Sequence, residues 1–387
     1  MYITYDVTHY EPTMKKIFLY LLGLLLVACS NAPVSKPKRP QDPTAFPYIQ
    51  EEVTFKNPKA ENSLSGTLTI PSDGKVSKIV VLITGSGPQD RNQEPEGLNH
   101  RPFLVWSDWL TRNGIAVLRY DDRGVGKSTG VFATGTTGDF ADDAEAAVNY
   151  IRSREDLKML SIGLIGHSEG GMIAPMVASR NEAVSFICLL AGPGIPIHEL
   201  MVQQAKDQMR LSGASAQDIN LTVSGMHKIY RTIHDNAGLP SSELKLKLDT
   251  LLYTEIKRAP PRLLHGKSVD EVVKITSEKY LSPWFKYFIR FEPADYLSKV
   301  KCPVLALNGT LDSQVESTSN LAAIKNALQK ASNSNHQEIA LAGLNHLFQK
   351  AQTGAVSEYM QISETINPNA LKIVSTWINK LKIVQTK

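Results

Sequence analysis

The sequence predicts an α/β fold: a doubly wound, mostly parallel sheet with a helical segment inserted into it. From residue 79 onward, short β-branched apolar runs alternate with helix-like amphipathic stretches, as in consecutive βαβ units. The alternation stops between residues 194 and 296, where the pattern is helical, and it resumes afterwards. With 42% hydrophobic and 21% charged residues, the 387-residue chain has the composition of an ordinary globular protein.

The first predicted strands differ from the later ones. Residues 53–55 and 64–70 alternate apolar and polar side chains, which is typical of antiparallel strands. Residues 79–83 form a continuous apolar run, which suits a strand buried on both faces of a parallel sheet. The other predicted strands are residues 115–120, 162–165, 184–190, 303–307 and 338–341, and the predicted helices are residues 103–113, 139–154, 172–180, 319–329 and 369–382.

The N-terminal 29 residues are predicted to be a secretory signal peptide. Two lysines at 15 and 16 precede an apolar run over residues 17–27 and a small residue. This run is too short to span a bilayer, which needs roughly 20 residues. Residues 26–29, Leu-Val-Ala-Cys, resemble the lipobox of bacterial lipoproteins, which implies cleavage before Cys29 and a lipid on that cysteine. An ordinary cleaved signal with an incidental cysteine is the alternative.

Three further expectations follow from this segment. Residues 1–13 precede the basic start of the signal, so translation is predicted to begin at Met14. Residues 30–47 contain five prolines and are predicted to be a disordered linker. The protein is therefore expected in the bacterial cell envelope, attached to a membrane through its N-terminal lipid only. Which membrane that is, and the oligomeric state, are left open.

Charge and the remaining cysteines point to no other partner. The net charge of +4 is small and spread along the chain, so no nucleic-acid partner is predicted. Cys188 and Cys302 lie in apolar strand-like runs, which favours buried free thiols, with a disulfide as the alternative in an envelope protein.

The strongest chemical signal is the run Gly-His-Ser-Glu-Gly-Gly at residues 166–171, between a predicted strand and a predicted helix. This is a G-x-S-x-G pattern, in which the serine lies on a tight strand-to-helix turn and glycines are needed because neighbouring segments leave no room for side chains. Ser168 is therefore the candidate nucleophile. The backbone N–H of Glu169 is predicted to be the first donor to an oxyanion.

A serine hydroxyl needs a base to remove its proton, and a third group must orient that base. His346 follows the last predicted strand, where the chain order Ser–acid–His requires the base. Asp312 follows the penultimate strand, at the carboxyl end where functional groups of open α/β sheets gather. Glu316 is a rival for the acid. The other histidines lie before or in the signal, in linkers, in the inserted segment, next to Ser168 or before the last strand: His9, His100, His167, His198, His227, His234, His265 and His336.

The second oxyanion donor is expected in the loop after the first parallel strand, residues 84–88. The backbone N–H of Ser86 is the first choice and that of Gly87 the second. A glycine-rich turn without a catalytic part is the alternative reading of this loop.

Residues 121–129 contain Gly-Lys-Ser after a strand, as a phosphate-binding loop does. That pattern requires glycine five residues before Gly126, where this chain has Asp121. Because a carboxylate there would repel phosphate, the stretch is interpreted as a structural turn, in which Arg123 and Ser128 brace the loop.

Taken together, the motifs at 85–91, 122–128, 166–171 and 308–312 resemble those of bacterial α/β-hydrolases of the carboxylesterase and serine aminopeptidase-like branch. The resemblance extends from residue 48 to the C-terminus. It implies an α/β-hydrolase fold and the hydrolysis of small esters with short or medium acyl chains. It implies neither a cofactor nor a metal ion.

The same triad serves peptidases and thioesterases, so both remain alternatives, and a non-catalytic lipoprotein that binds an acyl ligand is a third. The predicted organisation is a core over 48–193 and 297–387 with a helical cap over 194–296. Aromatic residues cluster between 280 and 291. They either line an acyl pocket or, as we favour, pack the cap on the core.

Overall fold

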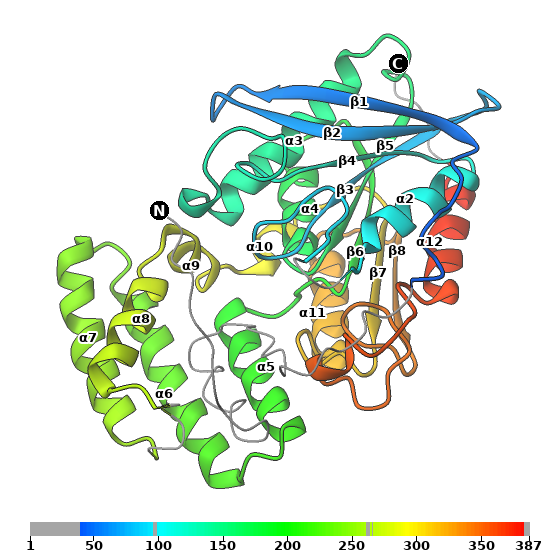
Figure 1. Ribbon diagram of the computed structural model, residues 1–387. Coiled ribbons are helices and arrows are strands. Elements are labelled where there is room, and N and C mark those ends of the chain that lie inside the picture. The colour runs from blue at the N-terminus through cyan, green and yellow to red at the C-terminus, as the bar shows by residue number, and fades with distance from the viewer. Residues whose placement is uncertain (1–38, 96–98, 261–263, 265, 383–387) are drawn as a thin grey trace. The chain divides into compact units, whose positions relative to one another are not determined.

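A computed structural model describes residues 39–95, 99–260, 264 and 266–382 of the chain. Within them an eight-stranded sheet has the order β1-β2-β4-β3-β5-β6-β7-β8 (Figure 1). The strands are β1 (Tyr48–Asn57), β2 (Asn62–Pro71), β3 (Lys78–Ile83), β4 (Ala116–Tyr120), β5 (Ser161–His167), β6 (Val184–Leu190), β7 (Val304–Gly309) and β8 (His336–Leu341). Strand β2 runs antiparallel to both β1 and β4, and every other neighbouring pair is parallel. The predicted doubly wound, mostly parallel sheet is confirmed.

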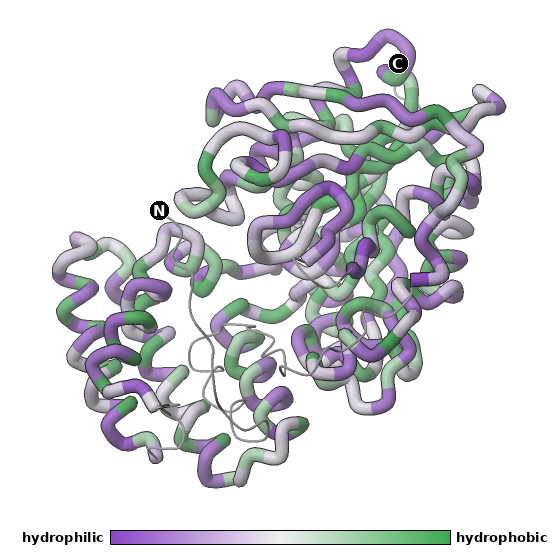
Figure 2. The backbone as a smooth tube through the Cα atoms, in the orientation of Figure 1, coloured by the Kyte–Doolittle hydropathy of each residue, from purple (hydrophilic) through white to green (hydrophobic). Residues whose placement is uncertain are grey.

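Helices cover both faces of this sheet because its inner strands are apolar on both sides. In β3, Ile79 and Val81 join one hydrophobic cluster, and Val80 and Leu82 join the other. Figure 2 shows hydrophobic residues along these inner strands. The first cluster includes residues of α3 (Thr137–Ser153), α4 (Gly170–Ala178) and α11 (Ser317–Lys330), and the second includes residues of α2 (Pro102–Arg112) and α12 (Pro368–Lys380). The alternation of side chains along each strand thus produces two cores.

The described chain divides into two compact units. One contains residues 39–204 and 282–382, and with them the sheet; the other contains residues 205–281. The boundary near 204 falls inside α5 (Ile197–Leu211). The short helices α9 (Pro283–Phe288) and α10 (Pro293–Leu297) belong to the sheet unit.

The second unit is helical throughout its described residues. It contains α6 (Ala216–Asp235), α7 (Ser241–Lys257), α8 (Val269–Tyr280) and the last turns of α5. On α7 the buried residues recur every fourth position, at Leu244, Leu248, Leu252 and Ile256, which places them on one helix face. This unit covers fewer residues than the predicted inserted segment, residues 194–296. That the segment acts as a cap stays a prediction.

Most of the predicted N-terminal features, including Met14 and Cys29, lie outside the described residues. None of the helices within the described ranges is long and apolar enough to span a bilayer.

Residues 39–42, here called the N-terminal strap, differ from the prediction of a linker extending to residue 47. The Arg39 guanidinium donates hydrogen bonds to the carbonyls of Asn99, at 3.0 Å, and Ile362, at 2.5 Å. The Gln41 amide nitrogen donates to the Ile366 carbonyl at 2.6 Å, and its oxygen accepts from the Thr365 N–H at 2.6 Å. This end of the predicted linker is therefore fixed to the sheet unit.

We expect Gln41→Ala to lower the free energy of unfolding by about 1–3 kcal/mol, because it leaves partly buried backbone groups at residues 365 and 366 without partners. Urea unfolding followed by fluorescence measures this change. The matched control is Gln50→Ala, an exposed glutamine on β1, for which the expected change is below about 0.5 kcal/mol. Equal stability of both variants and the wild type would contradict the role of the strap.

Candidate active site

Ser168 lies on a sharp turn between β5 and α4. Its φ of +55° is in the left-handed region, which a serine rarely adopts. The Ser168 N–H donates to the Leu190 carbonyl at 2.9 Å, and the Ser168 carbonyl accepts from the Gly171 N–H at 2.8 Å. Bonds on both sides of the residue therefore fix the strained turn, and the partly exposed side chain stands above a buried strand.

The glycines around Ser168 are required by close backbone contacts. A Cβ atom at Gly166 would lie 1.9 Å from the Gly170 carbonyl oxygen, and one at Gly170 would lie 2.2 Å from the Ile83 carbonyl oxygen. At Gly171 it would lie 2.6 Å from the Cα of Gly192. No side chain fits at these distances, so the structure gives the predicted reason for the glycines of the motif.

Gly166→Ala is accordingly expected to lower the free energy of unfolding by about 3 kcal/mol or more, because the clashing atoms belong to the backbone and cannot turn away. Urea unfolding of the purified variant measures it. In the control Gly238→Ala, the added Cβ meets nothing within 4 Å, so the expected change is below about 0.5 kcal/mol. A Gly166→Ala protein as stable as this control would refute the packing described here.

Asp312 and His346 are brought together by the structure. Asp312 follows β7, His346 follows β8, and both side chains are buried. The Nδ1 atom of His346 lies 2.8 Å from Oδ2 of Asp312. The other oxygen of Asp312, Oδ1, accepts from the N–H groups of Gln314, at 2.8 Å, and Val315, at 2.9 Å. The carboxylate is thus fixed by the backbone on one side and faces the imidazole on the other.

Glu316, the rival acid, is engaged elsewhere. Its carboxylate caps the N-terminus of α11 by accepting from the N–H groups of Thr318, at 2.7 Å, and Ser319, at 2.8 Å. The pairing with His346 belongs to Asp312.

His167, the residue before Ser168, connects the turn to the loop that carries His346. Its Nε2 lies 3.0 Å from the His346 carbonyl oxygen, so Nε2 carries the proton and donates it. Its Nδ1 then accepts from the amide nitrogen of Gln93 at 2.9 Å. Burial, together with the neighbouring His346, lowers the pKa of His167 to about 3. His167 is therefore a neutral structural residue.

The predicted oxyanion loop, residues 84–88, runs beside the nucleophile; with the following Gln89 it is here called the oxyanion loop. A Cβ atom at Gly85 would lie 3.2 Å from Cβ of Ser168. Asp122 holds both ends of the loop, since its carboxyl group accepts from the Thr84 hydroxyl at 2.9 Å and from the Gln89 N–H at 3.0 Å. Ser86 is exposed in the middle of the loop. That the Ser86 N–H, rather than that of Gly87, faces the substrate stays a prediction.

The side chain of Glu169, which the motif did not explain, is buried beside this loop. Its Oε1 accepts from the Thr137 hydroxyl at 2.6 Å and from the Trp284 indole N–H at 2.9 Å, and its carboxyl group also bonds the Ser86 side chain. Burial raises its pKa. In the sequence, this buried role of the Glu169 side chain is indicated only by the position of an acidic residue directly before an apolar helix. Trp284 comes from the aromatic cluster, so this member of the cluster reaches the site.

The stretch at 121–129 is a brace, as predicted. The Ser128 hydroxyl donates to the Asp121 carbonyl at 2.7 Å, and the Arg123 guanidinium donates to the Asp143 carboxylate at 2.6 Å. A Cβ atom at Gly126 would lie 2.5 Å from an Asp121 carboxylate oxygen, so a carboxylate occupies the place that a phosphate would need.

The chain is similar to known proteins in three comparisons. Residues 104–245 match the family model described as "Serine aminopeptidase, S33". Esterase EstD of Thermotoga maritima is 28% identical over 214 residues, which cover 55% of this chain and 49% of that protein. An uncharacterized protein of Escherichia coli K12, YfhR, is 29% identical over 136 residues, which cover 35% of this chain and 44% of that protein. The chain thus spans about half the length of the curated relatives it matches.

Among solved structures, the esterase Pf2001 of Pyrococcus furiosus superposes with a TM-score of 0.52 at 15% identity and covers 87% of this chain and 92% of its own. A hypothetical protein of Pseudomonas aeruginosa, PA2218, superposes with a TM-score of 0.51 at 13% identity, covering 88% and 96%. At these identities the likeness concerns the fold, which is the fold that the motifs predicted.

Proposed function

We propose that this chain, which has the α/β-hydrolase fold and resembles an esterase and a serine aminopeptidase family model over part of its length, is a serine hydrolase that cleaves carboxylic esters through an acyl-enzyme on Ser168. The observation that carries the proposal is the buried Asp312–His346 hydrogen bond next to the strained Ser168 turn. A backbone strained at one polar residue is typical of a functional site.

In the proposed reaction, the Nδ1–H of His346 donates to Asp312, which leaves Nε2 as the nitrogen that takes the Ser168 proton. The serine oxygen attacks the ester carbonyl, and the N–H groups of Glu169 and Ser86 stabilise the oxyanion. His346 then gives its proton to the leaving alcohol. Water, activated by the same histidine, releases the acid and restores Ser168.

Ester rather than amide cleavage is favoured by the longer of the two sequence alignments reported above, because that relative is named an esterase. The family model named for an aminopeptidase keeps peptide hydrolysis as the second candidate. A series of p-nitrophenyl esters from acetate to decanoate, with aminoacyl p-nitroanilides beside it, separates the two. We expect turnover of the short and medium esters and its loss in Ser168→Ala. Turnover of the anilides alone would reject the esterase assignment.

We also propose that the protein is a lipoprotein of the bacterial cell envelope, with lipid on Cys29. This rests on the sequence pattern of residues 15–29. Metabolic labelling with a palmitate analogue is expected to mark the wild type but not Cys29→Ser, and labelling of both would reject the assignment.

A further inference from the structure

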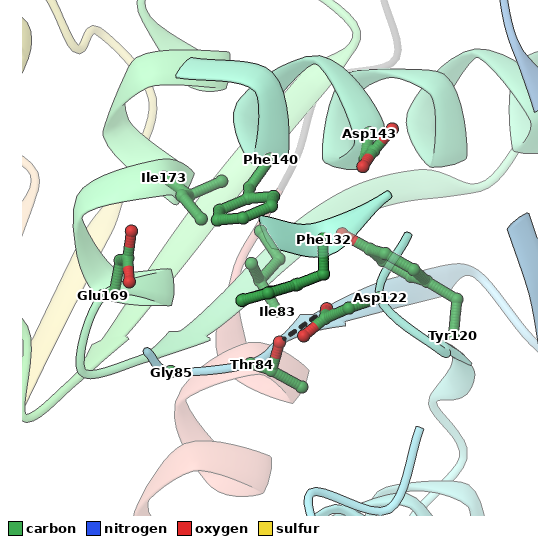
Figure 3. Close-up of a pocket in the computed structure, with 10 residues that line it drawn as sticks. All are labelled: Ile83, Thr84, Gly85, Tyr120, Asp122, Phe132, Phe140, Asp143, Glu169 and Ile173. Atoms are coloured by element: carbon green, nitrogen blue, oxygen red, sulfur yellow. Dashed lines mark hydrogen bonds between the residues drawn. The ribbon is translucent and has the colours of Figure 1, made fainter. Parts of the chain in front are cut away.

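A small cavity lies behind the oxyanion loop, between β3, β4, α3 and the Ser168 turn (Figure 3). Its volume is about 10 Å³, the space of a single water molecule. Three carboxyl groups, those of Asp122, Asp143 and Glu169, line it together with the Tyr120 side chain and apolar residues. Asp143 is paired with Arg123 at 2.6 Å. Among the described residues, neither Asp122 nor Glu169 forms an ion pair. Two carboxyl groups therefore line one cavity without a cationic partner.

These two residues, here called the carboxyl pair, contact the oxyanion loop at different points. Asp122 binds the Thr84 hydroxyl and the Gln89 N–H, at the two ends of the loop. Glu169 binds the Ser86 side chain in its middle. Figure 3 shows the Thr84 hydroxyl bonded to Asp122, and the carboxyl group of Glu169 on the side of Gly85. The loop is thus held from both sides by acids that line the same cavity.

We propose that Asp122 and Glu169 are positioning residues, which together hold the Ser86 N–H and the Glu169 N–H at one oxyanion and do so only while the pair retains a proton. The proposal rests on the proposed ester hydrolysis. Neither carboxyl group touches the substrate in it. They act through the loop, because the loop carries one of the two donors and Glu169 carries the other.

The proton follows from the surroundings of the pair. Burial, with a smaller contribution from the neighbouring carboxylates of Glu169 and Asp143, raises the pKa of Asp122 to about 8, although part of the residue is exposed. The other groups facing the cavity are the Tyr120 phenol on β4, whose pKa burial raises, and Asp143 on α3 with its partner Arg123. Below pH 8 the Asp122 carboxyl group is therefore mostly protonated, and its oxygens can still accept from the Thr84 hydroxyl and the Gln89 N–H. Above it, two carboxylates repel each other across the cavity.

The direction of the pH effect follows from the raised pKa. A carboxyl group whose pKa is higher in the folded than in the unfolded protein stabilises the fold below its unfolded value, near pH 4, and this stability is lost as the pH rises toward 8. Over the upper part of this pH range we expect the oxyanion loop to lose its fixed position and kcat to fall.

The test compares Asp122→Asn, Asp122→Ala and Glu169→Gln with the wild type on p-nitrophenyl acetate between pH 6 and 9.5. Asparagine is a permanent copy of the protonated acid, since its amide oxygen can accept from Gln89 and its nitrogen can donate to Thr84. Alanine removes both contacts. We expect Asp122→Ala to lower kcat at pH 7 by about tenfold to a hundredfold with little change in KM. Asp122→Asn should retain several times the kcat of Asp122→Ala.

The ratio of wild-type to Asp122→Asn kcat is expected to fall at least about tenfold between pH 7 and pH 9.5, as Asp122 loses its proton in the wild type only. Glu169→Gln removes one carboxylate that raises the pKa of Asp122, while burial stays, so the same fall should shift in pH rather than disappear. Equal kcat in Asp122→Ala and wild type, or an unchanged alkaline fall in Asp122→Asn, would overturn the proposal.

A second readout separates this proposal from the proposed function. In the inactive Ser168→Ala background, Tm is measured against pH with and without Asp122→Asn. As the pH rises from 6 to 9, the Tm of Ser168→Ala should fall more than that of the variant that also carries Asp122→Asn. If the two Tm values change with pH in parallel, the proposal that the pair holds a proton is wrong. If the wild type shows no Ser168-dependent turnover, the ester-hydrolase assignment fails, while the Tm curves still decide whether the pair holds a proton.

Discussion

His346→Ala is expected to lower kcat for p-nitrophenyl esters by about 10⁶-fold, since loss of the base of a serine triad costs about as much as loss of the whole triad. In this chain the contacts of His346 identify it as the proposed base. Nδ1 of His346 is engaged with Asp312 at 2.8 Å, and its ring packs against that of His167, with centroids 4.8 Å apart. His167 cannot replace it, because both of its ring nitrogens are already hydrogen-bonded.

The control for this variant is His227→Ala, an exposed histidine on α6, which should leave kcat within about twofold of the wild type. His227→Ala should unfold with urea as the wild type does to within about 0.5 kcal/mol, whereas His346→Ala should stay folded but lose about 1–3 kcal/mol, because the buried Asp312 carboxylate loses its partner. A folded His346→Ala protein that keeps more than about one hundredth of wild-type kcat would show that another group removes the serine proton.

Asp312→Asn is expected to lower kcat by about 10⁴-fold while the protein stays folded. The carboxylate oxygen accepts the Nδ1 proton of His346 and so keeps Nε2 free of a proton. Asparagine can still accept from the N–H groups of Gln314 and Val315 through its oxygen, and it then turns its NH₂ group toward Nδ1. That arrangement selects the tautomer with the proton on Nε2, which cannot take the proton of Ser168.

Glu316→Gln is the matched control, since it neutralises a carboxylate four residues away that caps α11. It should cost about 1 kcal/mol of stability and leave kcat within a few-fold of the wild type. If Glu316→Gln reduced kcat as much as Asp312→Asn does, the assignment of the acid would be wrong.

The sequence predicted the sheet and the neighbourhood of Asp312 and His346 because both follow parallel strands, whose carboxyl ends meet at one edge. It underestimated β1, which was predicted over residues 53–55 and extends over Tyr48–Asn57. Of the seven additional residues only Tyr48 and Asn57 are buried, and the other five are held in the strand by antiparallel pairing with β2 rather than by burial.

Other features could not be predicted because they depend on contacts between distant segments. The motif specified a role for the Glu169 N–H, but its side chain finds Thr137 and Trp284, which are 32 and 115 positions away. Proline-rich composition predicted a linker over residues 30–47, yet Gln41 pairs with backbone groups 324 and 325 positions further on. Local patterns carry no information on such partners.

The central claim is that Ser168 is the nucleophile, and covalent labelling tests it most directly. The protein is treated with a fluorophosphonate, its intact mass is measured, and the modified peptide is sequenced by mass spectrometry. We predict one adduct per chain, located on Ser168, absent from Ser168→Ala and formed far more slowly in His346→Ala. An unmodified wild type, an adduct on another residue, or equal labelling of Ser168→Ala would contradict the account.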